Sequence, residues 1–118
     1  MPNPFVHVEL STTDASASKT FYAKLFDWTM QDTPTPHGDY TLISVGGGGT
    51  GGGIMQQANM PSTWLAYVDV DDINAATQKA KSLGATVVQE VMEVKDMGWF
   101  SIIIDPTGAK LGLWKTKT

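Results

Sequence analysis

The chain has 118 residues, 42% hydrophobic and 17% charged, which is enough for one globular domain with its own hydrophobic core. Its net charge is −4 and its sequence has no block of lysines or arginines, so a nucleic-acid partner is not expected. The absence of cysteine excludes disulfides, thiolate metal sites and cysteine nucleophiles.

The N-terminal sequence MPNPFVHVEL has no basic segment followed by a long apolar run, so no signal peptide is expected. The apolar runs elsewhere are only a few residues long, far short of a membrane span. These features predict a cytoplasmic protein without a membrane partner.

The first predicted element is a strand over residues 5–11, where apolar and polar side chains alternate. Val6, Val8 and Leu10 are expected to pack under the first helix. His7 and Glu9 then lie on the opposite face of the strand.

A helix is predicted next, with Asp14 as its N-cap. Ala17, Phe21 and Leu25 recur every four residues and form its expected packing face. Three strands follow, in the segments FDWTMQDT, YTLISV and GIMQQ. His37 lies in the proline-rich turn TPTPHGD and is expected at the surface.

Seven glycines crowd the segment VGGGGTGGG, residues 45–53. A phosphate-binding loop needs its glycines between a strand and a helix, so that the helix N-terminus faces the phosphate. Here the run lies between two predicted strands and no Gly-Lys-Ser/Thr follows it. The run is therefore interpreted as a flexible hairpin connection.

The second half repeats the order of the first. After the strand STWLAYVDV, either Asp71 or Asp72 caps a helix that Gly84 ends. The expected buried stripe of this helix is Ile73, Ala76, Ala80 and Leu83. The strands ATVVQEVMEV, GWFSIIID and KLGLWK complete the half, with a DPTG turn before the last.

The two halves align by counting. An offset of 58 carries Leu25 to Leu83, and an offset of 59 carries GIM at 53–55 to GLW at 112–114. This small drift indicates an internal duplication, supported by pattern more than by identical residues.

The segments HVELSTTDASASKTFYAKLFDW, YVDVDDINAATQKAKSLGATV and DPTGAKLGLW resemble the two modules of the vicinal oxygen chelate superfamily. That family includes glyoxalase I, bleomycin-resistance proteins and extradiol dioxygenases, and this chain is similar to its lactoylglutathione lyase-related group. The resemblance extends from about Phe5 to Trp114.

The resemblance implies an α+β fold, in which two βαβββ modules form a curled, mainly antiparallel sheet with the helices outside. It implies one domain over residues 1–118, with module one at about 3–57 and module two at about 61–116. A homodimer is also expected, since small members of the family commonly dimerise.

Metal-bearing members of the family place ligands in the first and last strand of each module. The corresponding positions here resemble His7, Gly53, Leu65 and Gly112. Three of these four have no side-chain donor, whereas such an ion needs three or four nitrogen or oxygen ligands. No metal and no other cofactor is therefore expected, the alternative being a divalent metal completed by other ligands.

The candidate catalytic residues are His7 and Glu9, which share one strand face and could transfer protons or belong to a solvated polar face. Aromatic side chains in a curved sheet suit a planar organic ligand, although core packing is an equal alternative. Scattered methionines usually fill gaps in a core. The full set of ligand-binding candidates is His7, Glu9, Tyr67, Trp99, Trp114 and Met55.

Two function classes compete, and a structural or interaction module with a vestigial cup is a weaker third. The first is a metal-free protein that binds a small organic molecule in the cup of the curled sheet. The second is a metal-dependent lyase or dioxygenase of the glyoxalase type that uses His7 and Glu9. The missing carboxylates at Gly53 and Gly112 favour the first.

Overall fold

The computed structural model describes residues 2–36 and 38–118, so the predicted surface position of His37 lies outside the described residues. The chain divides into two compact units. Unit one is His7–Leu65, and unit two is Met1–Val6 together with Ala66–Thr118.

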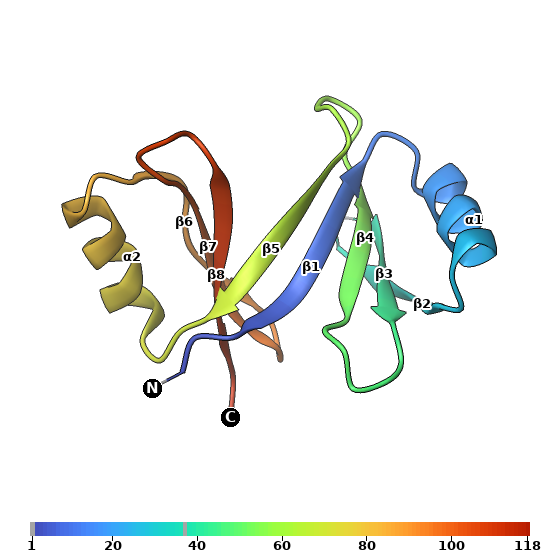
Figure 1. The fold of residues 1–118 in the computed structure, drawn as a ribbon, viewed down its shortest axis with the longest axis horizontal. Coiled ribbons are helices and arrows are strands. Elements are labelled where there is room, and N and C mark those ends of the chain that lie inside the picture. The colour runs from blue at the N-terminus through green and yellow to red at the C-terminus, as the bar shows by residue number, and fades with distance from the viewer. Residues whose placement is uncertain (1, 37) are drawn as a thin grey trace. The chain divides into compact units, whose positions relative to one another are not determined.

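Unit one contains a four-stranded mixed sheet and one helix (Figure 1). The strands lie in the order β2-β3-β4-β1, with β1 parallel to β4 and the other neighbours antiparallel. In chain order the elements are β1 (Phe5–Thr12), α1 (Ala15–Leu25), β2 (Thr29–Thr35), β3 (Gly38–Ser44) and β4 (Gly52–Gln56).

Unit two repeats this arrangement. Its strands lie in the order β5-β8-β7-β6, and β5 is parallel to β8 as β1 is to β4. Its elements are β5 (Thr63–Asp69), α2 (Ile73–Ser82), β6 (Thr86–Val94), β7 (Gly98–Ile104) and β8 (Lys110–Thr116). The predicted α+β class with two βαβββ modules is confirmed.

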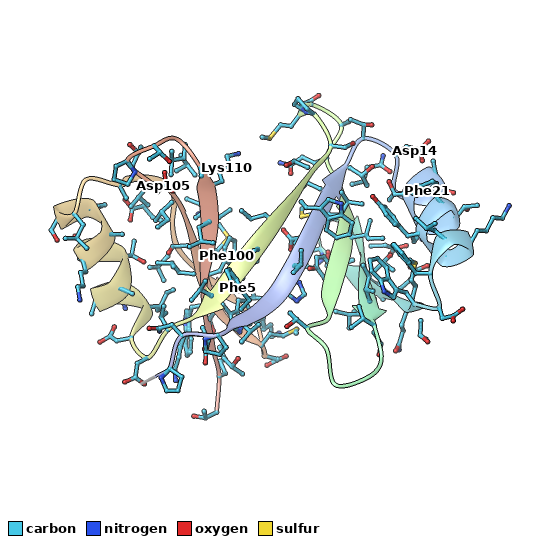
Figure 2. The ribbon with its side chains drawn as sticks, viewed as in Figure 1. Phe5, Asp14, Phe21, Phe100, Asp105 and Lys110 are labelled. Atoms are coloured by element: carbon cyan, nitrogen blue, oxygen red, sulfur yellow. The ribbon has the colours of Figure 1, made fainter. Side chains whose placement is uncertain are left out.

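Both helices begin at an aspartate cap. Asp14 accepts a hydrogen bond from the Ala17 backbone N–H at 3.0 Å, at the start of α1 in Figure 2. Asp72, rather than Asp71, accepts the equivalent bond from Ala75, also at 3.0 Å. Each cap satisfies a backbone donor that the first helical turn leaves unpaired.

The predicted packing face of α1 is wrong. Phe21 and Leu25 are 58% and 55% exposed, and Ala17 is also exposed. The helix instead turns Ala15 and Tyr22 toward the core residues Leu10, Ile43 and Ile54.

Polar anchors explain this rotation of α1. The Ser18 hydroxyl lies 2.8 Å from the Thr12 hydroxyl, and Lys19 Nζ lies 3.2 Å from Asp32 Oδ1 on β2. These contacts require residues 18 and 19 to face the sheet, which directs Phe21 away from it.

In unit two the prediction for α2 is correct except at its end. Ile73 is buried with Val70, Ile103 and Leu113, and Ala76 and Ala80 pack against them, but Leu83 is 69% exposed. Thr77 provides the fourth buried position: its hydroxyl donates to the Ile73 carbonyl at 2.7 Å and lies 2.8 Å from the Ser101 hydroxyl. The pair satisfies both buried hydroxyls.

The glycine run connects β3 to β4, as the hairpin interpretation requires. Gly46, Gly47 and Gly48 all have positive φ, a conformation that glycine adopts at little cost. The end of the run has a different role, because Gly52 and Gly53 belong to β4. A Cβ atom at Gly52 would lie 2.0 Å from the Val8 carbonyl oxygen.

We predict that Gly52→Ala destabilises the protein by about 3 kcal/mol, because neither paired backbone can move aside without breaking the ladder. Gly48→Ala is the matched control. It meets no atom within 4 Å and should cost about 1 kcal/mol, from its positive φ alone. Urea unfolding of the two variants measures both values, and equal losses would contradict the proposed close approach of β4 to β1.

Candidate functional site

The two faces of the unit-one sheet carry different side chains. Leu10 is buried among Ile43 and Ile54 on the face that α1 covers, here called the helix face. His7 and Glu9 lie on the opposite face, as their alternation with Leu10 predicts. Val6 departs from the expected pattern, since it is 37% exposed instead of packing under α1.

Tyr40 of β3 joins His7 and Glu9 into one hydrogen-bonded group, here called the triad. Its hydroxyl oxygen lies 2.7 Å from His7 Nε2 and donates to Glu9 Oε2 at 2.8 Å. The His7 and Tyr40 rings are stacked, with centroids 6.3 Å apart and planes inclined by 20°. The sequence reasoning identified His7 and Glu9 but missed Tyr40.

The direction of these bonds follows from the charge on Glu9. An ionised carboxylate can only accept, so the single phenolic proton of Tyr40 points to Glu9. The Tyr40 oxygen is then the acceptor for His7, in the tautomer that carries its proton on Nε2.

Burial lowers the pKa of His7 below its ordinary value of 6.5. The cause is the loss of hydration of the charged imidazolium. His7 is therefore neutral at pH 7.

Gly53 is the residue that makes room for Tyr40. On β4 it pairs with Glu9, and Tyr40 pairs with Met55 two residues further along. The tyrosine ring therefore reaches Gly53 diagonally across the strands. A Cβ atom at position 53 would lie 2.1 Å from the Tyr40 hydroxyl oxygen.

Unit two has a similar pair on its corresponding face. Tyr67 of β5 lies over Gly112 of β8, where a Cβ atom would come within 2.3 Å of the ring. Tyr67 also makes an edge contact with Phe100, the ring centroids being 6.3 Å apart. Phe100, labelled in Figure 2, was not among the residues predicted from the sequence, although it directly follows the candidate Trp99.

The other predicted ligand-binding residues are distributed over both faces. Trp114 pairs with Phe100 and lies on the same face as Gly112, and its indole N–H donates to the Thr116 hydroxyl at 2.8 Å. Met55 shares the face of Gly53.

Trp99 lies apart from the other predicted ligand-binding residues of unit two. It packs against the core under α2, with Lys117 Nζ 5.3 Å from its ring centroid, so it lies on the helix face of unit two. Its alternation with Phe100 places these neighbours on opposite faces of β7.

Within residues 2–36 and 38–118, no three histidine, aspartate or glutamate side chains are grouped closely enough to share one metal ion. Glu90, a possible additional carboxylate, is paired with Lys81 at 3.0 Å. Among the same described residues, neither helix has the length and apolarity needed to cross a bilayer.

A family model described as "Glyoxalase/Bleomycin resistance protein/Dioxygenase superfamily" matches residues 5–113. The chain is 37% identical over 114 residues to "Putative glyoxylase CFP32" of Mycobacterium tuberculosis, covering 92% of this chain and 44% of that protein. It is 29% identical over 126 residues to "Anthracycline biosynthesis protein DnrV" of Streptomyces peucetius, covering 91% and 45%. The chain thus spans slightly less than half the length of these relatives.

A similar fold occurs in the crystal structure of methylmalonyl-CoA epimerase from Mycobacterium tuberculosis. The TM-score is 0.74 at 14% identity, with 97% of this chain and 88% of that chain covered. A Bacillus halodurans protein of the same fold gives a TM-score of 0.77 at 12% identity, covering 100% and 97%. At these identities the likeness concerns the fold.

We predict that His7 makes stability depend on pH below 6.5. There the unfolded chain protonates its histidine while the folded chain keeps His7 neutral, so the unfolded state binds more protons and stability falls as pH is lowered. His7→Gln in a His37→Gln background should remove this slope, compared with His37→Gln alone, in urea unfolding between pH 7 and pH 5. An unchanged slope would contradict a neutral, buried His7.

Proposed function

The chain belongs to the glyoxalase/bleomycin resistance protein/dioxygenase superfamily, and we propose that it binds a small organic molecule at the triad of unit one without a metal ion. The observation that carries this proposal is the position of Tyr40. Its hydroxyl bonds to both His7 and Glu9 and fills the space beside Gly53.

The residues present do not fit the metal that many family members hold. Gly53, Leu65 and Gly112 offer no side-chain donor. His7 and Glu9 are two residues apart on one strand, about 7 Å along it, and Tyr40 bonds to His7 Nε2 and Glu9 Oε2. We therefore assign no step of any reaction to a metal in this chain.

The triad favours a ligand that carries hydroxyl groups. A carboxylate is a strong hydrogen-bond acceptor, as the bond from Tyr40 to Glu9 illustrates, so a ligand that donates from a phenol or an enol suits this group. The aliphatic and thioether groups of Leu42 and Met55, on the same face as Gly53, offer apolar contact to the rest of such a molecule.

The relatives' names suggest a probe of this kind. One relative is named for anthracycline biosynthesis, and anthracyclines contain a planar hydroxyanthraquinone. We therefore choose 2,6-dihydroxyanthraquinone, which combines a flat apolar surface with two phenolic hydroxyls that lie away from the quinone carbonyls.

We predict that 2,6-dihydroxyanthraquinone binds the wild-type chain and that Glu9→Gln weakens binding about tenfold, the loss expected for one hydrogen bond to a charged group. Tyr40→Phe should also weaken binding, because the phenol no longer holds the Glu9 carboxylate in place. Tyr22→Phe, which removes a hydroxyl on the helix face, is the matched control and should leave affinity unchanged. Calorimetric titration measures all four proteins. Equal affinities in all four proteins would show that the triad does not take part in binding.

The second candidate function is a metal-dependent lyase or dioxygenase. Two curated relatives bear the name glyoxylase, and the neutral imidazole and carboxylate of His7 and Glu9 are groups suited to proton transfer. Metal content separates the two candidates.

We predict that the chain, incubated with Ni²⁺ or Zn²⁺ and then desalted, retains less than about one tenth of an equivalent of metal, because too few donors face one ion. Elemental analysis gives this value directly. Near one equivalent in the wild type, lost in His7→Ala, would overturn the metal-free proposal and restore the enzyme.

A further inference from the structure

Unit one contains a hollow on the helix face of its sheet, and therefore on the other side from the triad. Its volume is about 300 Å³. It is lined by Val8, Trp28, Ile43, Val45, Thr50, Gly51, Gly52 and Trp64.

Two glycines, Gly51 and Gly52, form part of the floor of this hollow, so no side chain fills the space above them. A Cβ atom at Gly52 would lie 2.0 Å from the Val8 carbonyl oxygen, and one at Gly51 would lie 2.8 Å from the Ile43 carbonyl oxygen. Close strand packing therefore leaves bare backbone where other strands would present side chains. The glycine run thus creates space on this face as well.

Two tryptophans form the walls. The rings of Trp28 and Trp64 have centroids 6.4 Å apart and planes inclined by 80°. Tyr22 makes an edge contact with Trp64, the two ring centroids being 5.4 Å apart. A flat guest in this corner can stack on one indole while it meets the other by its edge, the two arrangements that aromatic pairs prefer.

The described lining residues carry no charged side chain, so the hollow offers nothing to balance a charged guest. Its volume is roughly twice that of an engineered cavity of about 150 Å³ that binds benzene. From the size, the perpendicular indoles and the missing charge, we propose that this pocket, here called the indole pocket, binds a neutral aromatic molecule of one or two rings. The proposal is independent of ligand binding at the triad.

Indole is a suitable probe, because it is neutral, bicyclic and soluble in water. Four tryptophans give four side-chain N–H signals in a ¹H–¹⁵N spectrum of the labelled protein. We expect unlabelled indole to shift the Trp28 and Trp64 signals saturably, with a Kd of about 0.1–1 mM, the range for so small a ligand. Trp99 and Trp114, both in unit two, should not move.

Leu42 lies in β3 and Val45 follows directly after its last residue, so substitutions at these two positions form a matched pair. Val45→Phe places a ring in the indole pocket and should weaken indole binding at least tenfold, whereas Leu42→Phe adds the same ring on the opposite face and should not. Should Val45→Phe fail to fold, Thr50→Phe at the exposed rim provides the same block. Tyr40→Phe, which damages the triad, should leave indole binding unchanged.

Three results would overturn this proposal. The first is no shift at all up to saturating indole, and the second is equal shifts of all four tryptophans. The third is movement of the Trp28 and Trp64 signals on dilution without indole, which would assign the pocket to a second copy of the chain.

Discussion

The position of Tyr40 against Gly53 is the contact on which the chemistry of unit one depends. The phenol can bond to both His7 and Glu9 only because position 53 has no side chain. A larger residue there would displace the hydroxyl from both partners. One missing Cβ therefore makes room for the bond between Tyr40 and the Glu9 carboxylate and leaves position 53 without a side-chain donor.

Unit two also has a tyrosine ring packed against a glycine, but its surroundings differ. Tyr67 lies over Gly112 as Tyr40 lies over Gly53, but it comes from the first strand of its module instead of the third. It makes an edge contact with the ring of Phe100. The duplicated fold thus conserves the arrangement of strands while the side chains on its faces have diverged, as expected when function depends on sites placed on a shared fold.

The glycine run has three consequences along its length. Its first residues turn the chain through positive φ between β3 and β4. Gly51 and Gly52 then let backbones approach closely, which leaves the floor of the indole pocket bare. Gly53 admits Tyr40 on the other face. A segment whose composition suggested flexibility is therefore ordered by close packing at its C-terminal end.

The sequence by itself determined the two βαβββ modules, the Asp14 cap and the face of His7 and Glu9, because alternation, capping and turn residues act within a few neighbouring positions. It left the second cap open between Asp71 and Asp72, and the structure places it at Asp72. It also identified Gly53 as a position without a donor. The tertiary structure decided the rotation of α1, where Ser18 and Lys19 find partners on other elements and Phe21 turns outward. It likewise decided that Trp99 packs under α2 and that Tyr40 of β3 lies against Gly53 of β4. These outcomes depend on contacts between residues far apart in the chain, and local periodicity carries no information about which distant side chain fills a space.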